Sequence, residues 1–281
     1  MTASVLLTGA TGFVGRAVAI NLIKRGIPLR LVLRPGRANT LPVEFANVEI
    51  TETADLFAES VDWWAQTCAG VSTVVHLAWH VDPADYLTSH KNLTCLSGTL
   101  AVAQGAVEAG VSRFVGVGTC FEYDLTYGDL SVETTPLVPL TPYAAAKIAA
   151  FQCLDQWFAQ TDIAFLWGRL FYLYGQGENQ ARLVPFLHDR LSRGEEAPLS
   201  SGNQVRDFQD VAQAADLLVR AALSKTTGAF NVCSGEGITV RALAEQIADC
   251  YGRRDLLRFG ARPDKLVDPP RVVGIPTPLV N

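Results

Sequence analysis

The fold of this protein is most clearly encoded in one stretch near the start of the chain, Ser4-Val5-Leu6-Leu7-Thr8-Gly9-Ala10-Thr11-Gly12-Phe13-Val14-Gly15. Its first five residues are a short, mostly apolar run that ends at a glycine, which is typical of a buried strand. An amphipathic pattern with helical spacing follows to about Arg25, and Gly26 is a typical helix stop. The stretch therefore predicts a strand, a glycine turn and a helix in succession.

The three glycines of this turn are spaced three residues apart, and each suits a different task. Gly9 permits a tight turn, Gly12 lets the backbone approach a pyrophosphate, and Gly15 lets the helix pack closely on the strand. The N-terminus of the helix adds N–H donors and a partial positive charge. Purely structural turns would also use glycine, but between a strand and a helix this pattern indicates dinucleotide binding.

The end of the second predicted strand, at residues 28–34, bears on the choice of dinucleotide. An acidic residue at this point would hold the ribose 2′-hydroxyl of NAD. This chain instead has Arg34 there and Arg37 three residues later. Because an arginine can pair with a 2′-phosphate and stack on adenine, the sequence favours NADP over NAD as the cofactor. The alternative is a solvated loop arginine, which leaves NAD possible.

Two further apolar, β-branched runs, at residues 71–78 and 113–119, predict buried parallel strands. Open α/β sheets bind their ligands beyond the carboxyl ends of such strands, which places Trp79 and Thr119 at the expected site. We expect Thr119 to hydrogen-bond a substrate oxygen. His76, near the end of the first run, is interpreted as a structural hydrogen-bonding residue rather than a catalyst.

A second motif, Thr141-Pro142-Tyr143-Ala144-Ala145-Ala146-Lys147, supplies the candidate chemistry. Thr141 suits a helix N-cap and Pro142 suits the first helical position. Tyr143 and Lys147 then leave the same face of one helix, because they are four residues apart. A neighbouring ammonium favours phenolate, so we expect the tyrosine pKa to fall below its usual ~10 and the phenol to act as a proton donor. The alternative is an exposed helix face with an ordinary lysine.

The order of these elements predicts an α/β protein with a doubly wound parallel sheet of the Rossmann type and a small C-terminal substrate-binding lobe. The alternation of strands and helices weakens after about residue 170 and returns with a helix at 211–223 and a strand at 229–233. We therefore expect two units. The dinucleotide-binding unit comprises residues 1–170 and 205–235, and the lobe comprises residues 171–204 and 236–281.

Composition restricts the class of protein further. Hydrophobic residues make up 49% of the 281 residues and charged residues 18%, which is enough for a core and gives no sign of disorder. The net charge of −5 provides no basic surface for nucleic acid, and no apolar run reaches membrane-spanning length. The six cysteines lack metal-binding spacing and are expected to be reduced thiols. We therefore expect a cytoplasmic protein without a metal.

Several short motifs occur in the order that is typical of one known family. In chain order they are Gly9, Gly12, Gly15, Asp55-Leu56, His76-Leu77-Ala78, Asn92, Thr119, Tyr143, Lys147 and Arg206-Asp207-Phe208. This set resembles the extended short-chain dehydrogenase/reductases. More narrowly, it resembles the NAD(P)-dependent epimerase/dehydratase branch, which acts on nucleotide sugars. The resemblance covers about residues 3–265.

The resemblance implies a site in the cleft between the two units. The cofactor-binding residues that it implies are Gly9, Gly12, Phe13, Val14, Gly15, Arg34, Asp55, Leu56, Ala78, Tyr143 and Lys147. Asp55 and Leu56 would lie at the adenine, and Lys147 at the nicotinamide ribose. The implied catalytic group is Thr119, Tyr143 and Lys147. The candidate substrate-binding residues are Trp79 and Thr119, by their place after strands, and Arg206 and Arg262, as partners for the phosphates.

Departures from the family pattern reduce the number of reactions that we expect. Sugar 4,6-dehydratases of this branch carry Asp-Glu directly after the catalytic threonine, whereas this chain has Cys120 and Phe121, so we do not expect a dehydratase. Tyr172 stands where many relatives have a substrate-binding asparagine.

The leading hypothesis is an NADP-preferring oxidoreductase that reduces a keto group, or oxidises a hydroxyl, on a nucleotide-activated deoxysugar. The alternative enzyme is a nucleotide-sugar epimerase with transient oxidation at C4. A non-catalytic NADP-binding regulator is a third hypothesis. The family often dimerises through the Tyr-Lys helix and its neighbour, so the resemblance implies a homodimer that uses helices 92–109 and 143–160.

Overall fold

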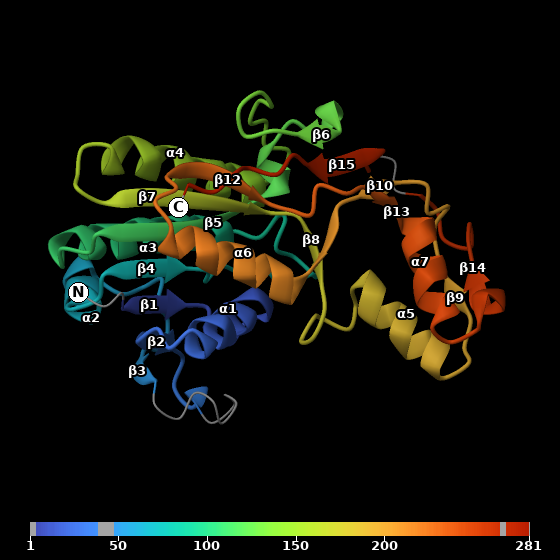
Figure 1. Ribbon diagram of the computed structural model, residues 1–281, viewed down its shortest axis with the longest axis horizontal. Helices are drawn as coiled ribbons and strands as arrows, with labels where there is room; N and C mark the ends of the chain where they lie inside the picture. The colour runs from blue at the N-terminus through green and yellow to red at the C-terminus, as the bar shows by residue number, and fades with distance from the viewer. Residues whose placement is uncertain (1–3, 39–47, 265–267, 281) are drawn as a thin grey trace.

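The computed structural model describes residues 4–38, 48–264 and 268–280, which form an α/β architecture (Figure 1). The main strands are β1 Val5–Thr8, β2 Leu29–Leu33, β3 Glu49–Glu52, β4 Thr73–His76, β5 Arg113–Thr119, β7 Ala164–Leu170 and β12 Gly228–Val232. Within the described residues they form one sheet in the order β12-β7-β5-β4-β1-β2-β3, and every neighbouring pair is parallel. The chain builds outward from β1 on one side and from β4 on the other. This confirms the predicted doubly wound parallel sheet.

Helices cover both faces of this sheet (Figure 1). They are α1 Phe13–Lys24, α2 Val61–Cys68, α3 Lys91–Glu108, α4 Pro142–Phe158 and α6 Val211–Leu223. On one face α1 packs against α6, and on the other α2 packs against α3, which packs against α4. Each face has its own buried apolar cluster, with Leu7 and Leu218 in one and Trp64 and Phe114 in the other. Because both faces are covered, the central strands are almost continuously apolar, and β5 is buried along its whole length.

A third apolar cluster lies in the lobe formed around α5 Leu183–Ser192 and α7 Val240–Asp249, which pack against each other. Figure 1 shows this lobe beyond one end of the central sheet. The short strands are β6 Asp129–Leu130, β8 Tyr172–Tyr174, β9 Ala197–Pro198, β10 Val205–Arg206, β11 Phe208–Asp210, β13 Ile238–Thr239, β14 Leu257–Arg258 and β15 Arg271–Gly274. β10 pairs with β13 and β15 rather than with the central sheet, and β15 also pairs with β6. After β15 the chain runs back along β12, where the Asn231 N–H donates to the Thr277 hydroxyl over 3.2 Å.

Local sequence explains where several of these elements begin and end. The Thr141 hydroxyl accepts a hydrogen bond from the Ala144 N–H at 3.2 Å, and Pro142 is the first residue of α4, so the predicted start of this helix is confirmed. α6 has the predicted bounds, and its cap Asp210 accepts from the Ala212 N–H at 2.7 Å. Gly26, with φ of +67°, follows the end of α1. None of the helices in the described ranges combines the length and the apolar character needed to cross a membrane.

Candidate active site

The glycine turn joins β1 to α1 at the point where β1 and β4 lie side by side. Gly9 has φ of +75°, and a Cβ at this position would lie 2.8 Å from the backbone nitrogen of Ala78, which follows β4. A Cβ at Gly15 would collide with the Gly9 carbonyl oxygen. At the exposed Gly12, the nearest atom would be that same oxygen at 3.2 Å. The turn itself therefore requires Gly9 and Gly15, whereas Gly12 leaves space at the helix N-terminus.

The first turn of α1 fits a pyrophosphate. Gly12 is the N-cap and makes no side-chain cap, and the first turn contains no acidic residue. Phe13 and Val14 begin the helix, so their backbone N–H groups have no acceptor within it. Uncapped N–H donors at the positive end of a helix attract an anion. The residues present at this turn therefore suit the dinucleotide cofactor that the sequence predicts.

The region predicted for the adenosine holds one residue that the sequence analysis missed. Arg34 follows β2 and is exposed, as predicted for a residue that could meet a 2′-phosphate. However, Glu52, the last residue of β3, lies beside the same loop and accepts a hydrogen bond from the Gly36 N–H at 3.2 Å. Asp55 and Leu56 lie in the turn between β3 and α2; Asp55 is exposed and Leu56 packs against the core. An acid is thus present at this end of the sheet, although the second strand does not supply it.

His76, at the end of β4, is a buried hydrogen-bonding residue. Its Nδ1 lies 2.9 Å from the Thr8 hydroxyl and its Nε2 lies 3.0 Å from the Thr99 hydroxyl. The Thr8 hydroxyl also accepts from the Ala78 N–H at 3.2 Å. Burial, helped by the charge of Lys147, lowers the pKa of His76 to about 3, so the imidazole is neutral. Its structural interpretation is confirmed: it joins the ends of β1 and β4 to α3.

The structure brings Thr119, Tyr143 and Lys147 together. Tyr143 and Lys147 lie one turn apart on α4 and are 7% and 5% exposed. The Lys147 ammonium donates to the Val117 carbonyl oxygen on β5 at 2.7 Å. Thr119 ends that strand, and its side chain lies close enough to Tyr143 to lower the pKa of the phenol. The sequence therefore predicted correctly that these three side chains converge at the carboxyl end of β5.

The expected effect of Lys147 on the phenol is wrong for this structure. Burial raises the pKa of Tyr143 above its usual range, and Tyr86 and Glu122 act in the same direction, while the Thr119 side chain opposes them. Burial also lowers the pKa of Lys147 to about 7, although Glu122 opposes this shift. The reason is that removal from water disfavours both the phenolate and the ammonium. Burial therefore outweighs the attraction between them that the four-residue spacing suggested.

Trp79 contacts Lys147 directly. Its indole Nε1 donates to Asn92 Oδ1 at 2.8 Å, and its ring centroid lies 3.7 Å from the Lys147 ammonium. The contact is a cation–π interaction, which favours the charged lysine. Asn92, at the start of α3, is itself fixed by a hydrogen bond to the Tyr86 carbonyl oxygen at 2.7 Å. The structure thus places Trp79 against Lys147, and it assigns to Asn92 the task of orienting the indole.

The two arginines predicted for the phosphates differ in their surroundings. Arg206 is 3% exposed, pairs with Asp268 at 2.5 Å, and has its guanidinium 5.4 Å from the centroid of the Tyr172 ring. Arg262 is exposed, and its guanidinium lies 5.0 Å from the centroid of the Phe186 ring on α5. Arg206 therefore already has a carboxylate partner, whereas Arg262 faces solvent beside α5.

Arg182 is a candidate that the sequence analysis missed. It is the exposed N-cap residue of α5, a position without a side-chain cap. Its guanidinium lies 5.8 Å from the centroid of the Tyr86 ring, and that ring packs edge-on against Tyr143 at 5.1 Å. A cation at an open helix N-terminus is a suitable partner for a phosphate. The signal available in the sequence was Pro185, which is tolerated in the first turn of a helix and so marks a helix start near Arg182.

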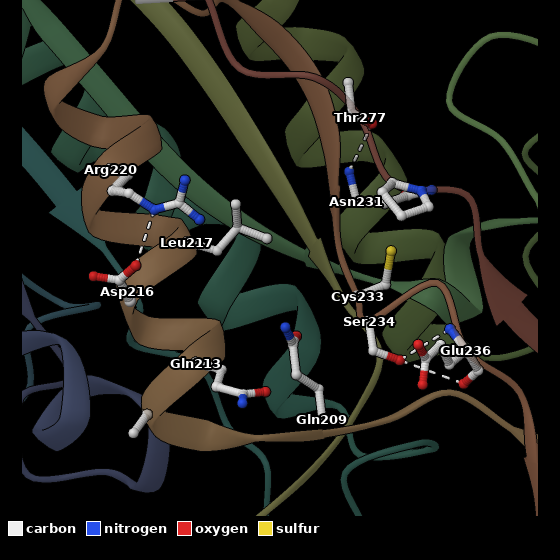
Figure 2. A pocket seen from close by; sticks show the side chains of 12 residues that line it. Gln209, Gln213, Asp216, Leu217, Arg220, Asn231, Cys233, Ser234, Glu236 and Thr277 are labelled. Carbon is white, nitrogen blue, oxygen red and sulfur yellow. Dashed lines mark hydrogen bonds and ion pairs between the residues drawn. The ribbon is translucent and has the colours of Figure 1, made fainter.

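A separate cavity of about 800 Å³ lies between α6 and the segment that follows β15 (Figure 2). Figure 2 shows Gln213 and Arg220 on the α6 side of it, with Cys233 and Thr277 opposite. None of the residues predicted for catalysis or cofactor binding lines this cavity. We therefore place the active site by the convergence of Tyr143 and its neighbours, not by this hollow.

Two curated relatives match most of the chain. The first is a dTDP-6-deoxy-L-talose 4-dehydrogenase (NAD(+)) from Aggregatibacter actinomycetemcomitans, 25% identical over 278 residues that span 96% of this chain and 99% of the relative. The second is a GDP-6-deoxy-D-mannose reductase from Pseudomonas aeruginosa, 27% identical over 269 residues that span 89% of this chain and 80% of the relative. Relatives of this chain thus include nucleotide-sugar oxidoreductases, and they also include UDP-arabinose 4-epimerases from Arabidopsis thaliana, one of which is 26% identical over 288 residues that span 88% of this chain and 67% of the relative.

A solved structure shares the fold of this chain, and a family model matches most of its sequence. The UDP-N-acetylglucosamine 4-epimerase from Methanobrevibacter ruminantium M1 has a TM-score of 0.84 at 19% identity, covering 99% of this chain and 91% of that one. At this identity the likeness shows the fold alone. The model of the NAD dependent epimerase/dehydratase family matches residues 5–233, which is most of the chain. The protein therefore belongs to the NAD dependent epimerase/dehydratase family.

Proposed function

We propose that the protein is an NAD(P)-dependent oxidoreductase that interconverts a keto group and a hydroxyl on a nucleotide-activated deoxysugar. The observation that carries the proposal is the convergence of Thr119, Tyr143 and Lys147 at the carboxyl end of β5. The glycine turn follows β1, and β4 alone separates β1 from β5 in the sheet. Three 6-deoxysugar oxidoreductases among the relatives support this choice of substrate class.

Each residue of the catalytic group has a distinct task in this proposal. A nicotinamide cofactor bound at the glycine turn supplies or accepts the hydride. Tyr143 gives its proton to the substrate carbonyl oxygen in reduction, or accepts the hydroxyl proton in oxidation. Thr119 orients that oxygen by a hydrogen bond, and Lys147 provides the positive charge that stabilises the phenolate left behind. The raised pKa of Tyr143 keeps the phenol protonated at neutral pH, which suits the reductive direction.

For the cofactor, we propose a preference for NADP that is weaker than the sequence alone suggested. Arg34 is exposed after β2 and available to a 2′-phosphate. The nearby Glu52 carboxylate would repel that phosphate and suits a ribose hydroxyl instead. One relative is named for NAD(+) and another, from Kitasatospora kifunensis, for NAD(P)(+). Use of both cofactors, with NADP preferred, agrees with this mixed environment.

For the substrate, we propose that cationic side chains around α5 bind the phosphates. Arg182 lies beside Tyr86, which contacts Tyr143, and Arg262 lies beside α5. Arg206 would have to exchange its Asp268 partner to reach a phosphate, so we assign it a smaller share of the binding. Two phosphates carry enough charge to need more than one such partner.

The direct test of this function is net cofactor consumption. Purified protein is mixed with NADPH and a dTDP- or GDP-linked 4-keto-6-deoxysugar, and the absorbance of the reduced nicotinamide is followed at about 340 nm. An oxidoreductase oxidises one cofactor for each sugar reduced. The epimerase alternative predicts no net oxidation of NADPH, and instead inversion of C4 in the corresponding 4-hydroxy sugar with no net change in absorbance. The regulator hypothesis predicts no change in either sugar or in the absorbance.

We also propose that the protein is a cytoplasmic homodimer that uses α3 and α4. Leu93 on α3 is 69% exposed, and Leu96, Leu100, Phe151 and Trp157 on the two helices are only partly buried. A second copy would cover this apolar surface. Light scattering on the purified protein should give twice the mass of the 30.3 kDa chain. Leu93→Asp should then give the monomer, and a monomeric parent protein would refute the proposal.

The proposed cytoplasmic location rests on the cysteines. All six are free thiols, which agrees with a reducing compartment.

A further inference from the structure

A fully buried ion pair lies next to the catalytic group, and the reaction described above does not use it. Glu122 is 0% exposed and comes three residues after Thr119. Its Oε2 accepts a hydrogen bond from Nε of Arg169, which is 2% exposed, at 2.6 Å. Apolar residues of similar volume usually stabilise a protein as well as a buried ion pair does. The Glu122–Arg169 ion pair is therefore better explained by a role in the candidate active site than by a role in stabilising the fold.

The carboxylate of Glu122 holds the backbone of the catalytic threonine. Its Oε1 accepts from the Thr119 N–H at 2.9 Å, and its two oxygens lie 3.1 and 3.2 Å from the indole Nε1 of Trp167. Gly118 makes this approach possible, because a Cβ there would collide with Glu122 Oε1 and with the indole nitrogen. A glycine within a buried strand is otherwise unfavourable, so the presence of Gly118 near the end of β5 supports a specific need for the contact.

Arg169 is fixed from the other side. Its guanidinium lies 4.8 Å from the centroid of the Tyr123 ring and 4.7 Å from that of the Phe151 ring. It also donates to the Tyr123 hydroxyl at 3.2 Å, and that hydroxyl donates to Asn231 Oδ1 at 2.7 Å. Every contact holds the ion pair in one place, so the negative charge of Glu122 has a fixed position behind the catalytic group.

We propose that Glu122 is a positioning residue for the catalytic group, whose carboxylate fixes the Thr119 backbone and whose negative charge keeps Lys147 protonated. This inference rests on one part of the proposed function, namely that Tyr143 and Lys147 take part in proton transfer. Trp167 links the two sites, since it donates to Glu122 and its ring lies 5.7 Å from the Lys147 ammonium.

Among the titratable groups around Lys147, Glu122 is the one whose charge acts on the lysine. These groups are His76 on β4, Cys95 on α3 and Glu122 after β5, and Tyr143 lies one turn away on the same helix. His76 is neutral, and burial raises the pKa values of the Cys95 thiol and of the phenol. The charge of Glu122 raises the pKa of Lys147 against the opposing effect of burial. Its removal should therefore release the lysine proton at lower pH.

The test measures the ionisation of Lys147 without any substrate, so it stands whatever sugar the protein acts on. The chain has five lysines, and ¹³C NMR of protein labelled at the lysine ε-carbons reports each amine separately. The Lys147→Met variant lacks one resonance and so assigns it. We expect Lys147 to titrate near the value of about 7 that the structure indicates. In Glu122→Gln this midpoint should fall by about one pH unit. Glu122→Asp keeps the charge and should stay close to the parent value.

The outcomes separate a role in charge from a role in packing. An unchanged midpoint in Glu122→Gln, or equal shifts in the Asp and Gln variants, would overturn the proposal. If Glu122→Gln does not fold, the double variant Glu122→Gln/Arg169→Gln leaves no buried charge unpaired and should show a downward shift as well. This shift should be smaller than in the single variant, because loss of the Arg169 cation acts in the opposite direction. Failure of the double variant to fold would also overturn the proposal, because the ion pair would then be required by the fold itself.

Discussion

Replacing Lys147 by methionine is expected to change how the stability of the protein depends on pH. The lysine amine is 5% exposed, and its nearest partners are a carbonyl oxygen at 2.7 Å and an indole ring at 3.7 Å. Burial lowers its pKa from 10.5 to about 7 in the folded protein. The unfolded chain, which exposes the amine to water, keeps the proton up to the ordinary value.

The sign and size of the effect follow from this difference. Below pH 7 the amine is charged in both states, and its burial destabilises the folded protein. As the pH rises from 7 towards 10.5, the folded state releases its proton before the unfolded state does, so the free energy of unfolding increases. The increase approaches about 1.4 kcal/mol per pH unit and amounts to about 2 kcal/mol between pH 7 and pH 9. Lys147→Met cannot show this increase.

The assay is unfolding by urea, without cofactor, for the parent protein and Lys147→Met across this pH range. The difference between the two free energies of unfolding cancels the titration of groups that both proteins share. It should rise with pH, in favour of the parent protein. Lys91→Met, which removes an exposed lysine, is the matched control and should give a constant difference. A constant difference for Lys147→Met as well would refute the account of a buried, easily deprotonated amine.

The remaining predictions concern the cofactor and the substrate. Gly15→Ala should lower the free energy of unfolding by about 2–4 kcal/mol and abolish cofactor binding, because the new Cβ would collide with the turn. Gly12→Ala is the control and should fold normally. Equal unfolding curves for the two variants would contradict this prediction. Arg34→Ala should weaken NADPH binding about tenfold in calorimetry and leave NADH binding unchanged. Glu52→Gln should strengthen NADPH binding, because it removes the carboxylate beside the 2′-phosphate. An unchanged ratio of NADPH to NADH affinity in both variants would contradict the proposed preference. Arg182→Gln should raise KM about tenfold with kcat nearly unchanged, and a loss confined to kcat would argue against phosphate binding.

Features of the site that depend on local sequence were predictable. The N-cap at Thr141 and the four-residue spacing of Tyr143 and Lys147 are properties of one helix, so the sequence placed both side chains on one face correctly. The glycines at 9 and 15 were predictable for the same reason, because the turn needs them whatever surrounds it.

Features that depend on long-range packing were not predictable from spacing. Glu52 reaches the loop after β2 only because β3 pairs with β2, which aligns Glu52 with Leu33. Arg169 meets Glu122 across 47 residues of sequence because β7 pairs with β5. The direction of the Tyr143 pKa shift was wrong because the four-residue spacing shows a neighbouring charge and does not show burial.

Two helices were also missed, and both are short. α2 has a clear local signal, since the Ser60 hydroxyl accepts from the Trp63 N–H at 3.2 Å, but its eight residues are too few for a periodic pattern. In α5, Pro185 lies in the first turn, where proline is tolerated, so it was a signal of a helix start that the sequence analysis did not use.

The central claim is that the Tyr143 phenol transfers the proton in a hydride-transfer reaction on a nucleotide sugar. Its most direct test is the turnover of Tyr143→Phe with NADPH and the 4-keto sugar accepted by the parent protein, together with cofactor affinity. The account predicts a loss of about a thousandfold in kcat, with NADPH bound as in the parent. Turnover by the phenylalanine variant within a few-fold of the parent would contradict it.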